Sequence, residues 1–185
     1  IGESTANIQS KYKFVSEDLI FQKNKMKLSS NKKSVITDDK FSLYKLGSFV
    51  YQINDKFLKG TDVTFTSNTN LPIGKSDQLF FKNGFFDLKN REFVAGETEI
   101  KLSKNTFNNF NNDPRLKGAS SSSKNGITVI EKSVFTSCKK NDKCPPWIIQ
   151  AKKITHDKNK KQLIYDDAFL KIYDIPVFYF PKFFH

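Results

Sequence analysis

The sequence has few of the residues that most active sites require. Its eight glycines are scattered and form no phosphate-binding loop. Its histidines, His156 and His185, are not at zinc-ligand spacing from its two cysteines. Ser120 to Ser123 lack both a G-x-S-x-G setting and a histidine partner. No apolar run approaches the roughly 18 residues of a membrane helix. The sequence therefore predicts no enzyme activity, no metal, no cofactor and no transmembrane helix.

Arginine and methionine are also scarce. The net charge is +12, but Arg91 and Arg115 are the only arginines among 31 basic residues, which leaves 31 − 2 = 29 lysines. Because nucleic-acid readers usually depend on bidentate arginine contacts, this balance argues against a nucleic-acid partner. Scattered lysines are typical of a solvated surface, and attraction to an anionic lipid or membrane surface is the alternative. Met26 is the single methionine, so Ile1 is not a natural start, and we expect a fragment cut at both ends.

Two cysteines, Cys138 and Cys144, lie in the segment CKKNDKC. The sequence shows neither a C-x-x-C redox motif nor the βαβ pattern that usually accompanies one. A structural disulfide in an oxidising compartment therefore fits better, with two free thiols as the alternative.

Short runs of alternating apolar and polar residues fill most of the chain. Examples are Val63 with Phe65 and Leu79 with Phe81, and Asn83-Gly84 then resembles a hairpin turn. Many short strands at regular spacing predict an all-β sandwich or an elongated antiparallel β-jellyroll without significant helix. Loose matches of an aspartate followed two or three positions later by phenylalanine suggest a repeat of about twenty residues. These matches begin at Asp18, Asp39, Asp62 and Asp77.

Some segments are expected to lie outside the strands. Residues 104–126 are rich in asparagine and serine, and they predict a long projecting loop. The acidic pairs Asp38-Asp39 and Asp166-Asp167 are expected in turns, because neighbours on a strand point to opposite faces. His156 is expected in an exposed turn, at the end of a strand.

Two stretches resemble the outer-membrane lipopolysaccharide-assembly protein family, called LptD or OstA. One is the C-terminal segment, with W-x-I-x-A from Trp147 and I-P-V-x-Y-x-P-x-F-x-H from Ile175 to His185. The other is P-R-L-x-G at residues 114–118, followed by an aromatic-x-x-Cys pattern that ends at Cys138. Together these stretches cover residues 112–185. The first hundred residues share only the general pattern of short strands and polar turns with the family.

The resemblance implies a single periplasmic domain over residues 1–185. This OstA-like β-jellyroll would have two facing sheets, V-shaped in section, and would belong to a Gram-negative outer-membrane protein whose C-terminal membrane barrel is missing here. It would receive lipopolysaccharide from a periplasmic bridge protein of the same fold and pass it to the barrel without covalent chemistry. The family's lipoprotein plug would bind the barrel. Cysteines at this place form disulfides in the family, in some members to the barrel.

These expectations define two sets of site residues and one rival function. The first set is a lipid groove of inward-pointing apolar side chains, at Phe65, Phe81, Leu102, Ile149 and Leu170. The second is an open N-terminal edge for the bridge protein, at Phe14, Leu19, Ile20 and Phe21. The rival function, suggested by the +12 charge and the strand pattern, is an all-β surface module that binds polyanions or glycans.

Overall fold

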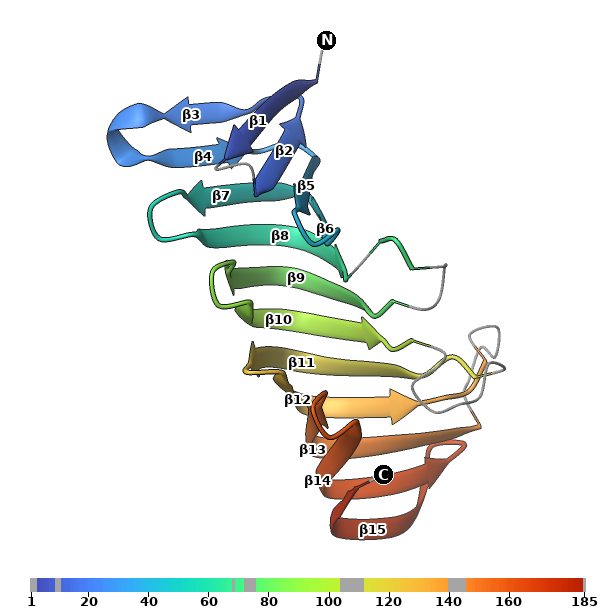
Figure 1. The fold of residues 1–185 in the computed structure, drawn as a ribbon. Helices are drawn as coiled ribbons and strands as arrows, with labels where there is room; N and C mark the ends of the chain where they lie inside the picture. The colour runs from blue at the N-terminus through green and yellow to red at the C-terminus, as the bar shows by residue number, and fades with distance from the viewer. Residues whose placement is uncertain are drawn as a thin grey trace.

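The computed structural model describes residues 3–8, 11–67, 69–71, 76–103, 112–139 and 146–184. This part of the chain forms a 15-stranded antiparallel sheet, in which strands follow one another as in a ladder from the N-terminal to the C-terminal end (Figure 1). The all-β prediction is therefore confirmed. The helical segment among the described residues is a single 3-10 turn, η1, and no described helix is long and apolar enough to cross a membrane. The strands are β1 (Ser4–Ile8), β2 (Tyr12–Ser16), β3 (Ile20–Gln22), β4 (Lys27–Ser30), β5 (Ser34–Asp38), β6 (Leu43–Leu46), β7 (Ser48–Gln52), β8 (Phe57–Thr66), β9 (Gln78–Asp87), β10 (Glu92–Lys101), β11 (Arg115–Lys124), β12 (Ile127–Thr136), β13 (Trp147–Asp157), β14 (Gln162–Ile172) and β15 (Ile175–Phe184), with η1 at Lys23–Lys25.

Every second long strand has one residue of left-handed backbone in its middle. These residues are Asp62, Glu97, Lys132 and Asp167, with φ of 47°, 46°, 47° and 51°. Their positions differ by 35 residues each time (97 − 62, 132 − 97 and 167 − 132). The residues that end the preceding turns, directly before each of these strands, also have positive φ and the same spacing; they are Lys56, Arg91, Gly126 and Lys161. The structural repeat is thus a 35-residue strand pair, and the expected twenty-residue repeat is wrong.

The left-handed residue changes which side chains point inward. On β8, Leu58 and Gly60 are buried before Asp62, and Val63 is buried directly after it. Asp62 lies opposite Lys82 of β9, between the pairs Thr61↔Asn83 and Val63↔Phe81, and the alternation of faces shifts by one position on both strands where the sheet bends. Apolar residues therefore reach the same interior from both halves of a strand.

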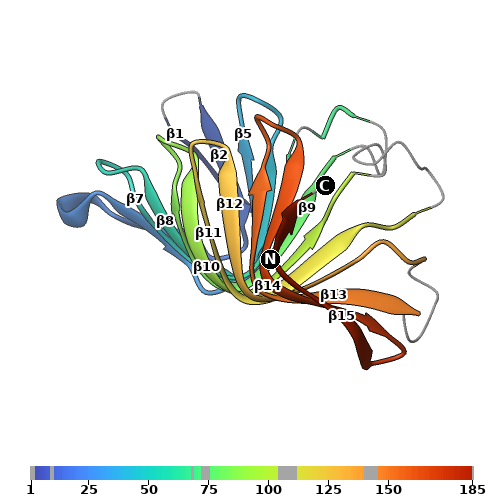
Figure 2. The ribbon, with the colours of Figure 1, turned by 90° about the horizontal axis from the view of Figure 1, so that it is seen from below.

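The bends divide the sheet into two arms that curve toward each other as an open trough (Figure 2). One arm carries the turns at 53–56, 88–91, 125–126 and 158–161, and we call it the short-turn arm. The other carries the connections 67–77, 102–114 and 137–146, and we call it the long-connection arm. The two facing layers are thus halves of one bent sheet. Side chains from both arms form one hydrophobic core, including Phe14, Tyr51, Phe86, Phe135 and Tyr165.

The strands upstream of β8 are interrupted at the bend. Residues of β6 and β7 are separated by Gly47, whose N–H donates to the carbonyl of Thr61 at 2.8 Å. The first half of β8 then pairs with β7 and the second half with β6. In the same way, β4 and β3 continue the short-turn arm, while β5, β2 and β1 continue the long-connection arm.

Residues 115–124 were expected in a loop, but they form strand β11. Ser121 pairs with Ala95 of β10 on one side and Ile130 of β12 on the other. Its hydroxyl forms a buried hydrogen bond with the hydroxyl of Thr98 at 2.6 Å. Pairing on both sides thus overrides the weak strand propensity of serine. Of the expected loop, residues 104–111 lie outside the described part of the chain.

Asn83-Gly84 was expected to form a hairpin turn, but both residues lie inside β9 at the bend. Gly84 is buried, and a Cβ at this position would lie 2.8 Å from the ring of Phe86. Glycine is therefore used here for close packing inside the bend. The hairpin turn comes later, at residues 88–91.

Candidate functional site

A cavity of about 470 Å³ lies between the two arms. The apolar part of its wall is mostly aromatic and comes from β6, β8, β9 and β10, while β11, β12 and β13 contribute the polar residues Ser123, Thr128 and His156. The ring centroids of Tyr44 and Phe65 are 4.7 Å apart, and those of Phe81 and Phe93 are 4.9 Å apart. Phe86 adds a ring 5.7 Å from Phe81. The bend shift gives this wall its composition, because it aims Phe81 and Phe86 of the same strand into one space.

The five expected groove residues occupy inward positions of different depth. Phe65 and Phe81 line the cavity, and Phe81 is buried. Leu102 is also buried, at the end of the long-connection arm. Ile149 is partly buried against the core, and its strand partner Leu170 is partly exposed. The structure therefore brings Phe65 and Phe81 together in one cavity, while Ile149 and Leu170 lie further along the trough.

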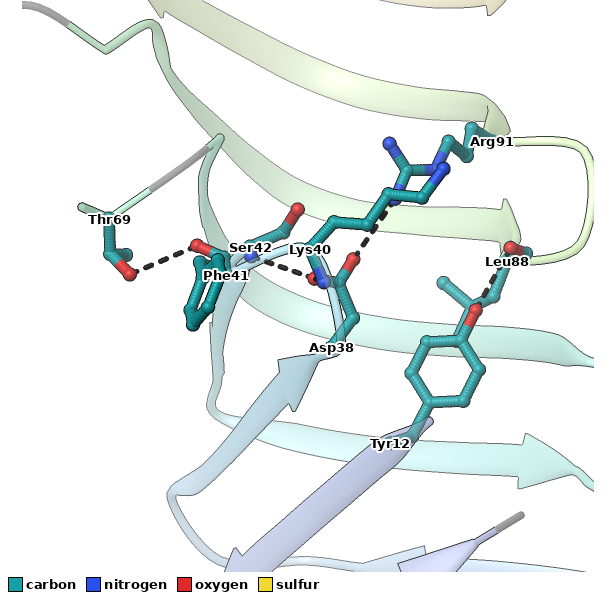
Figure 3. A network of polar contacts seen from close by, with 8 residues as sticks. All are labelled: Tyr12, Asp38, Lys40, Phe41, Ser42, Thr69, Leu88 and Arg91. Atoms are coloured by element: carbon teal, nitrogen blue, oxygen red, sulfur yellow. Dashed lines mark hydrogen bonds and ion pairs between the residues drawn. The ribbon is translucent and has the colours of Figure 1, made fainter. Parts of the chain in front are cut away.

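Polar contacts close the mouth of the cavity toward its N-terminal end (Figure 3). Arg91, in the β9–β10 turn of the short-turn arm, donates to Asp38 at the end of β5 over 3.5 Å. Asp38 also accepts from the backbone N–H of Lys40 at 2.9 Å and of Ser42 at 2.8 Å. The strand register puts Asp38 on the long-connection arm, so this ion pair joins the two arms.

A tyrosine adds a second contact between the arms at the same end. The hydroxyl of Tyr12 on β2 donates to the carbonyl of Leu88 at 3.0 Å (Figure 3). Burial and the nearby Asp38 carboxylate raise the pKa of Tyr12 above its ordinary value, so the hydroxyl keeps its proton at neutral pH. This donor therefore persists over the physiological pH range.

A second ion pair joins the arms toward the C-terminal end of the cavity. Asp77 precedes β9 on the long-connection arm, and Lys158 follows β13 on the short-turn arm. The Lys158 ammonium lies 3.3 Å from the Asp77 carboxylate, which also accepts from the backbone N–H of Ser103 at 2.9 Å. Asp77, Arg91 and Lys158 all line the cavity. The apolar interior thus has a mouth bounded by two ion pairs.

His156 was expected in an exposed turn, and this expectation is wrong. It lies near the end of β13, is 8% exposed and lines the cavity beside Lys158. Burial lowers the pKa of His156, and the nearby Asp77 carboxylate opposes this effect in part. The imidazole is therefore neutral at pH 7. The sequence hid this because β13 crosses the bend at Lys152, opposite Lys132, and the buried positions there change phase from Ala151 to Ile154 and then His156.

The structure places the four residues of the expected docking edge in different settings. Phe14 is fully buried on β2, which is paired with both β1 and β5, so its assignment to an edge is wrong. Ile20 and Phe21 lie on β3, which pairs only with β4 among the described strands, and they are exposed. Leu19 precedes β3 and is partly buried against the core. The N-terminal edge therefore consists of β1 on one arm and β3 on the other.

The C-terminal edge is the most apolar exposed surface among the described residues. Strand β15 pairs with β14, and its far side has no partner strand within the described chain. Ile175, Phe178 and Phe184 are each more than 60% exposed. An edge strand with such side chains favours pairing with another β-element.

Of the two cysteines expected to form a disulfide, the structure describes Cys138. Cys138 is partly buried, and its Sγ is 3.8 Å from the carbonyl of Trp147. Cys144 lies outside the described residues, so the pairing stays a prediction.

Asp166 and Asp167 were expected in a turn, but they lie within β14, where Asp166 pairs with Lys153 at 2.9 Å and Asp167 with Lys152 at 3.9 Å. Asp38 and Asp39 do lie at the end of β5 and in the turn after it.

No family model and no curated protein matches this chain. Within the described ranges, no group of three or more histidine, cysteine, aspartate or glutamate residues could hold a metal ion.

Proposed function

We propose that this protein binds lipopolysaccharide by its acyl chains and conducts it along the trough. The observation that carries the proposal is the cavity of about 470 Å³ with aromatic walls and a polar mouth. Its volume falls in the range of about 300–1,000 Å³ that is usual for ligand sites. The apolar side chains continue beyond it, through Leu102, Ile149 and Leu170.

The energetics of such a trough suit transport rather than catalysis. Each buried methylene contributes about 0.8 kcal/mol, so a lipid with several acyl chains binds strongly without any specific polar contact. Because these contacts are non-directional, a chain can exchange one aromatic neighbour for the next as it moves. The phosphorylated sugars remain at the mouth, in water and near the lysines.

The partners follow from the two ends of the sheet. We propose that a periplasmic bridge protein of the same fold docks on the N-terminal edge strands β1 and β3, and adds its own strand there. The apolar edge at β15 would face an outer-membrane barrel, whose lipoprotein plug is reached only through that barrel. In this proposal the protein is a periplasmic domain of a Gram-negative outer-membrane protein.

Site-specific photo-crosslinking in Gram-negative cells tests the proposal. A photo-reactive amino acid at Phe81 is buried in the cavity wall, and we expect it to capture lipopolysaccharide. The control is Lys101 on the outer face, where its ammonium lies 4.1 Å from the ring centroid of Phe80. Equal capture at both positions would contradict the proposal.

The second candidate function is a surface module for polyanions or glycans. It is supported by the +12 charge and by the outer face of the short-turn arm, where the Lys59 ammonium lies 5.4 Å from the ring centroid of Phe85. Exposed aromatic and cationic side chains of this kind bind extended polyanions. Binding of heparin that depends on Phe85 and is unaffected by substitution of Phe81 would favour this function over lipid transport.

A further inference from the structure

The two ion pairs at the cavity mouth join segments that the sheet holds far apart. Asp77 and Lys158 flank strands β9 and β13, which are four strands apart in the sheet. Asp38 ends β5, Arg91 lies in the turn after β9, and the two likewise lie on opposite arms. Neither pair is therefore an ordinary cross-strand pair, and each one spans the opening between the arms.

Within each pair the acid is held more firmly than the base. The Asp38 side chain is 5% exposed and accepts two backbone N–H groups, and Asp77 is 18% exposed and accepts one. Arg91 and Lys158 are 52% and 47% exposed. When either pair opens, the carboxylate keeps its backbone partners. The cation then loses this ion-pair partner and can accept another anion at the mouth.

The surroundings of these cations favour an anion with an apolar tail. The cavity behind them includes the rings of Tyr44, Phe65, Phe86 and Phe93, which offer burial to an apolar chain, and Asp87 and Glu92 also line it. Arg91 supplies a planar donor fork that suits a carboxylate or a phosphate, and Lys158 supplies a point charge.

We propose that the cavity takes one acyl chain of an amphiphile whose anionic headgroup displaces Asp38 and Asp77 from Arg91 and Lys158. The two ion pairs then close the mouth in the absence of ligand, and the headgroup opens it by replacing each aspartate as the partner of the cation. The inference rests on the proposed function, because it assigns the headgroup end of the same acyl-binding cavity. The shared chemistry is a carboxylate or phosphate on an acyl chain.

Displacement of a neutral apolar dye from the 185-residue chain tests this inference. N-phenyl-1-naphthylamine reports the cavity by its fluorescence, and dodecyl phosphate, dodecanoate and dodecan-1-ol compete for it. We expect both anions to displace the dye at about tenfold lower concentration than the alcohol. A phosphate preference over dodecanoate identifies a phosphorylated headgroup, and the reverse identifies a carboxylate; either result supports the exchange.

Two double variants distinguish an anion preference caused by the cations at the mouth from one caused by the overall positive charge. In Arg91→Gln/Lys158→Gln the preference for anions should fall to within about twofold, with displacement by dodecan-1-ol unchanged. The matched control is Lys82→Gln/Lys101→Gln, which removes two cations paired with Asp62 and Glu99 away from the cavity and should keep the preference. Asp77→Asn should increase the affinity for dodecyl phosphate several-fold, because it frees Lys158.

The outcomes distinguish this inference from the proposed function. A wild-type chain that binds the dye but shows no preference for anions overturns the inference alone. A preference that survives in Arg91→Gln/Lys158→Gln also overturns it, since the overall charge then explains the effect. A folded chain in which neither the dye nor any dodecyl compound enters the cavity overturns the proposed function.

Discussion

The Lys158 ammonium lies 3.3 Å from the Asp77 carboxylate, although 81 positions (158 − 77) separate the two residues in the chain. The sheet brings them together because its bent strands also twist. The long-connection arm at β9 thereby meets the short-turn arm at β13. The same offset appears at the other end of the cavity, where Tyr12 on β2 contacts Leu88 after β9.

This ion pair should contribute measurably to stability and be sensitive to salt. A double-mutant cycle with Asp77→Asn and Lys158→Gln is expected to give a coupling energy of about 0.5–1 kcal/mol, as for other partly exposed pairs. Urea denaturation at low salt and at about 1 M NaCl measures it, and screening should remove most of the coupling at high salt. A coupling energy of zero in low salt would mean that the arms are not held by this pair.

His156 should make the fold less stable in mild acid. Its pKa is lowered by burial, so the unfolded chain binds a proton below about pH 6.5 while the folded chain does not. Unfolding therefore takes up protons, and stability falls as the pH drops through this window. The titratable groups that face the imidazole are Asp77, Asp157 and Lys158.

Thermal unfolding at pH 7.5 and 5.5 measures this effect. The decrease in Tm between the two values should be smaller in His156→Gln than in the natural chain. An equal decrease in both proteins would assign the acid sensitivity to other groups.

The left-handed residues at the bends should respond to substitution unlike their neighbours. Lys132 has φ of 47°, a conformation that β-branched residues rarely adopt. Lys132→Ile is expected to lower the free energy of unfolding by about 1–2 kcal/mol, and Lys132→Gly should leave it unchanged or raise it.

Lys152 is the matched control for this bend. It is exposed, lies at the same bend on the neighbouring strand β13, and is not among the residues with positive φ. Lys152→Ile should therefore cost less than about 0.5 kcal/mol, because isoleucine is favoured in strands. Similar costs at both positions in urea denaturation would refute a special role for the backbone at 132.

Gly118 should be the least replaceable glycine in the described sheet. A Cβ at this position would clash with Ile130 Cγ2 and lie 2.8 Å from the backbone carbonyl oxygen of Glu131. Because the backbone at Glu131 cannot move without disturbing the strand, Gly118→Ala is expected to lower the free energy of unfolding by about 1–3 kcal/mol. At Gly47 the new atom would lie 3.1 Å from the Asp62 carboxylate and 3.5 Å from the backbone oxygen of Thr61, so Gly47→Ala should cost clearly less.

Period-two patterning predicted the fold class and two of the cavity residues. Val63 with Phe65 and Leu79 with Phe81 alternate in runs short enough to lie within one half of a strand. Alternation fails where a run crosses the bend, because the inward phase shifts there by one position on both paired strands. This is why His156 and Asn83-Gly84 were misplaced.

The rest of the site depends on contacts that local sequence does not encode. Asp38 and Arg91 are 53 positions apart (91 − 38), and their meeting depends on the twist accumulated over several strands. Ser120 to Ser123 have the composition of a loop, and they form a strand because partners on both sides supply the hydrogen bonds. The 35-residue spacing is visible in the backbone angles, while the side chains at the four bends are aspartate, glutamate, lysine and aspartate.

The regular spacing of the bends makes the length of the trough an adjustable quantity. One 35-residue unit adds two strands, one short turn and one left-handed bend residue. In the next unit the same positions again face the interior. Removing or duplicating a whole unit would leave the cross-section and the inward face intact. An insertion of a single residue within a strand would instead turn every following side chain of that strand to the opposite face. Evolution can therefore change how far such a protein reaches without redesigning its interior, provided that changes come in whole units.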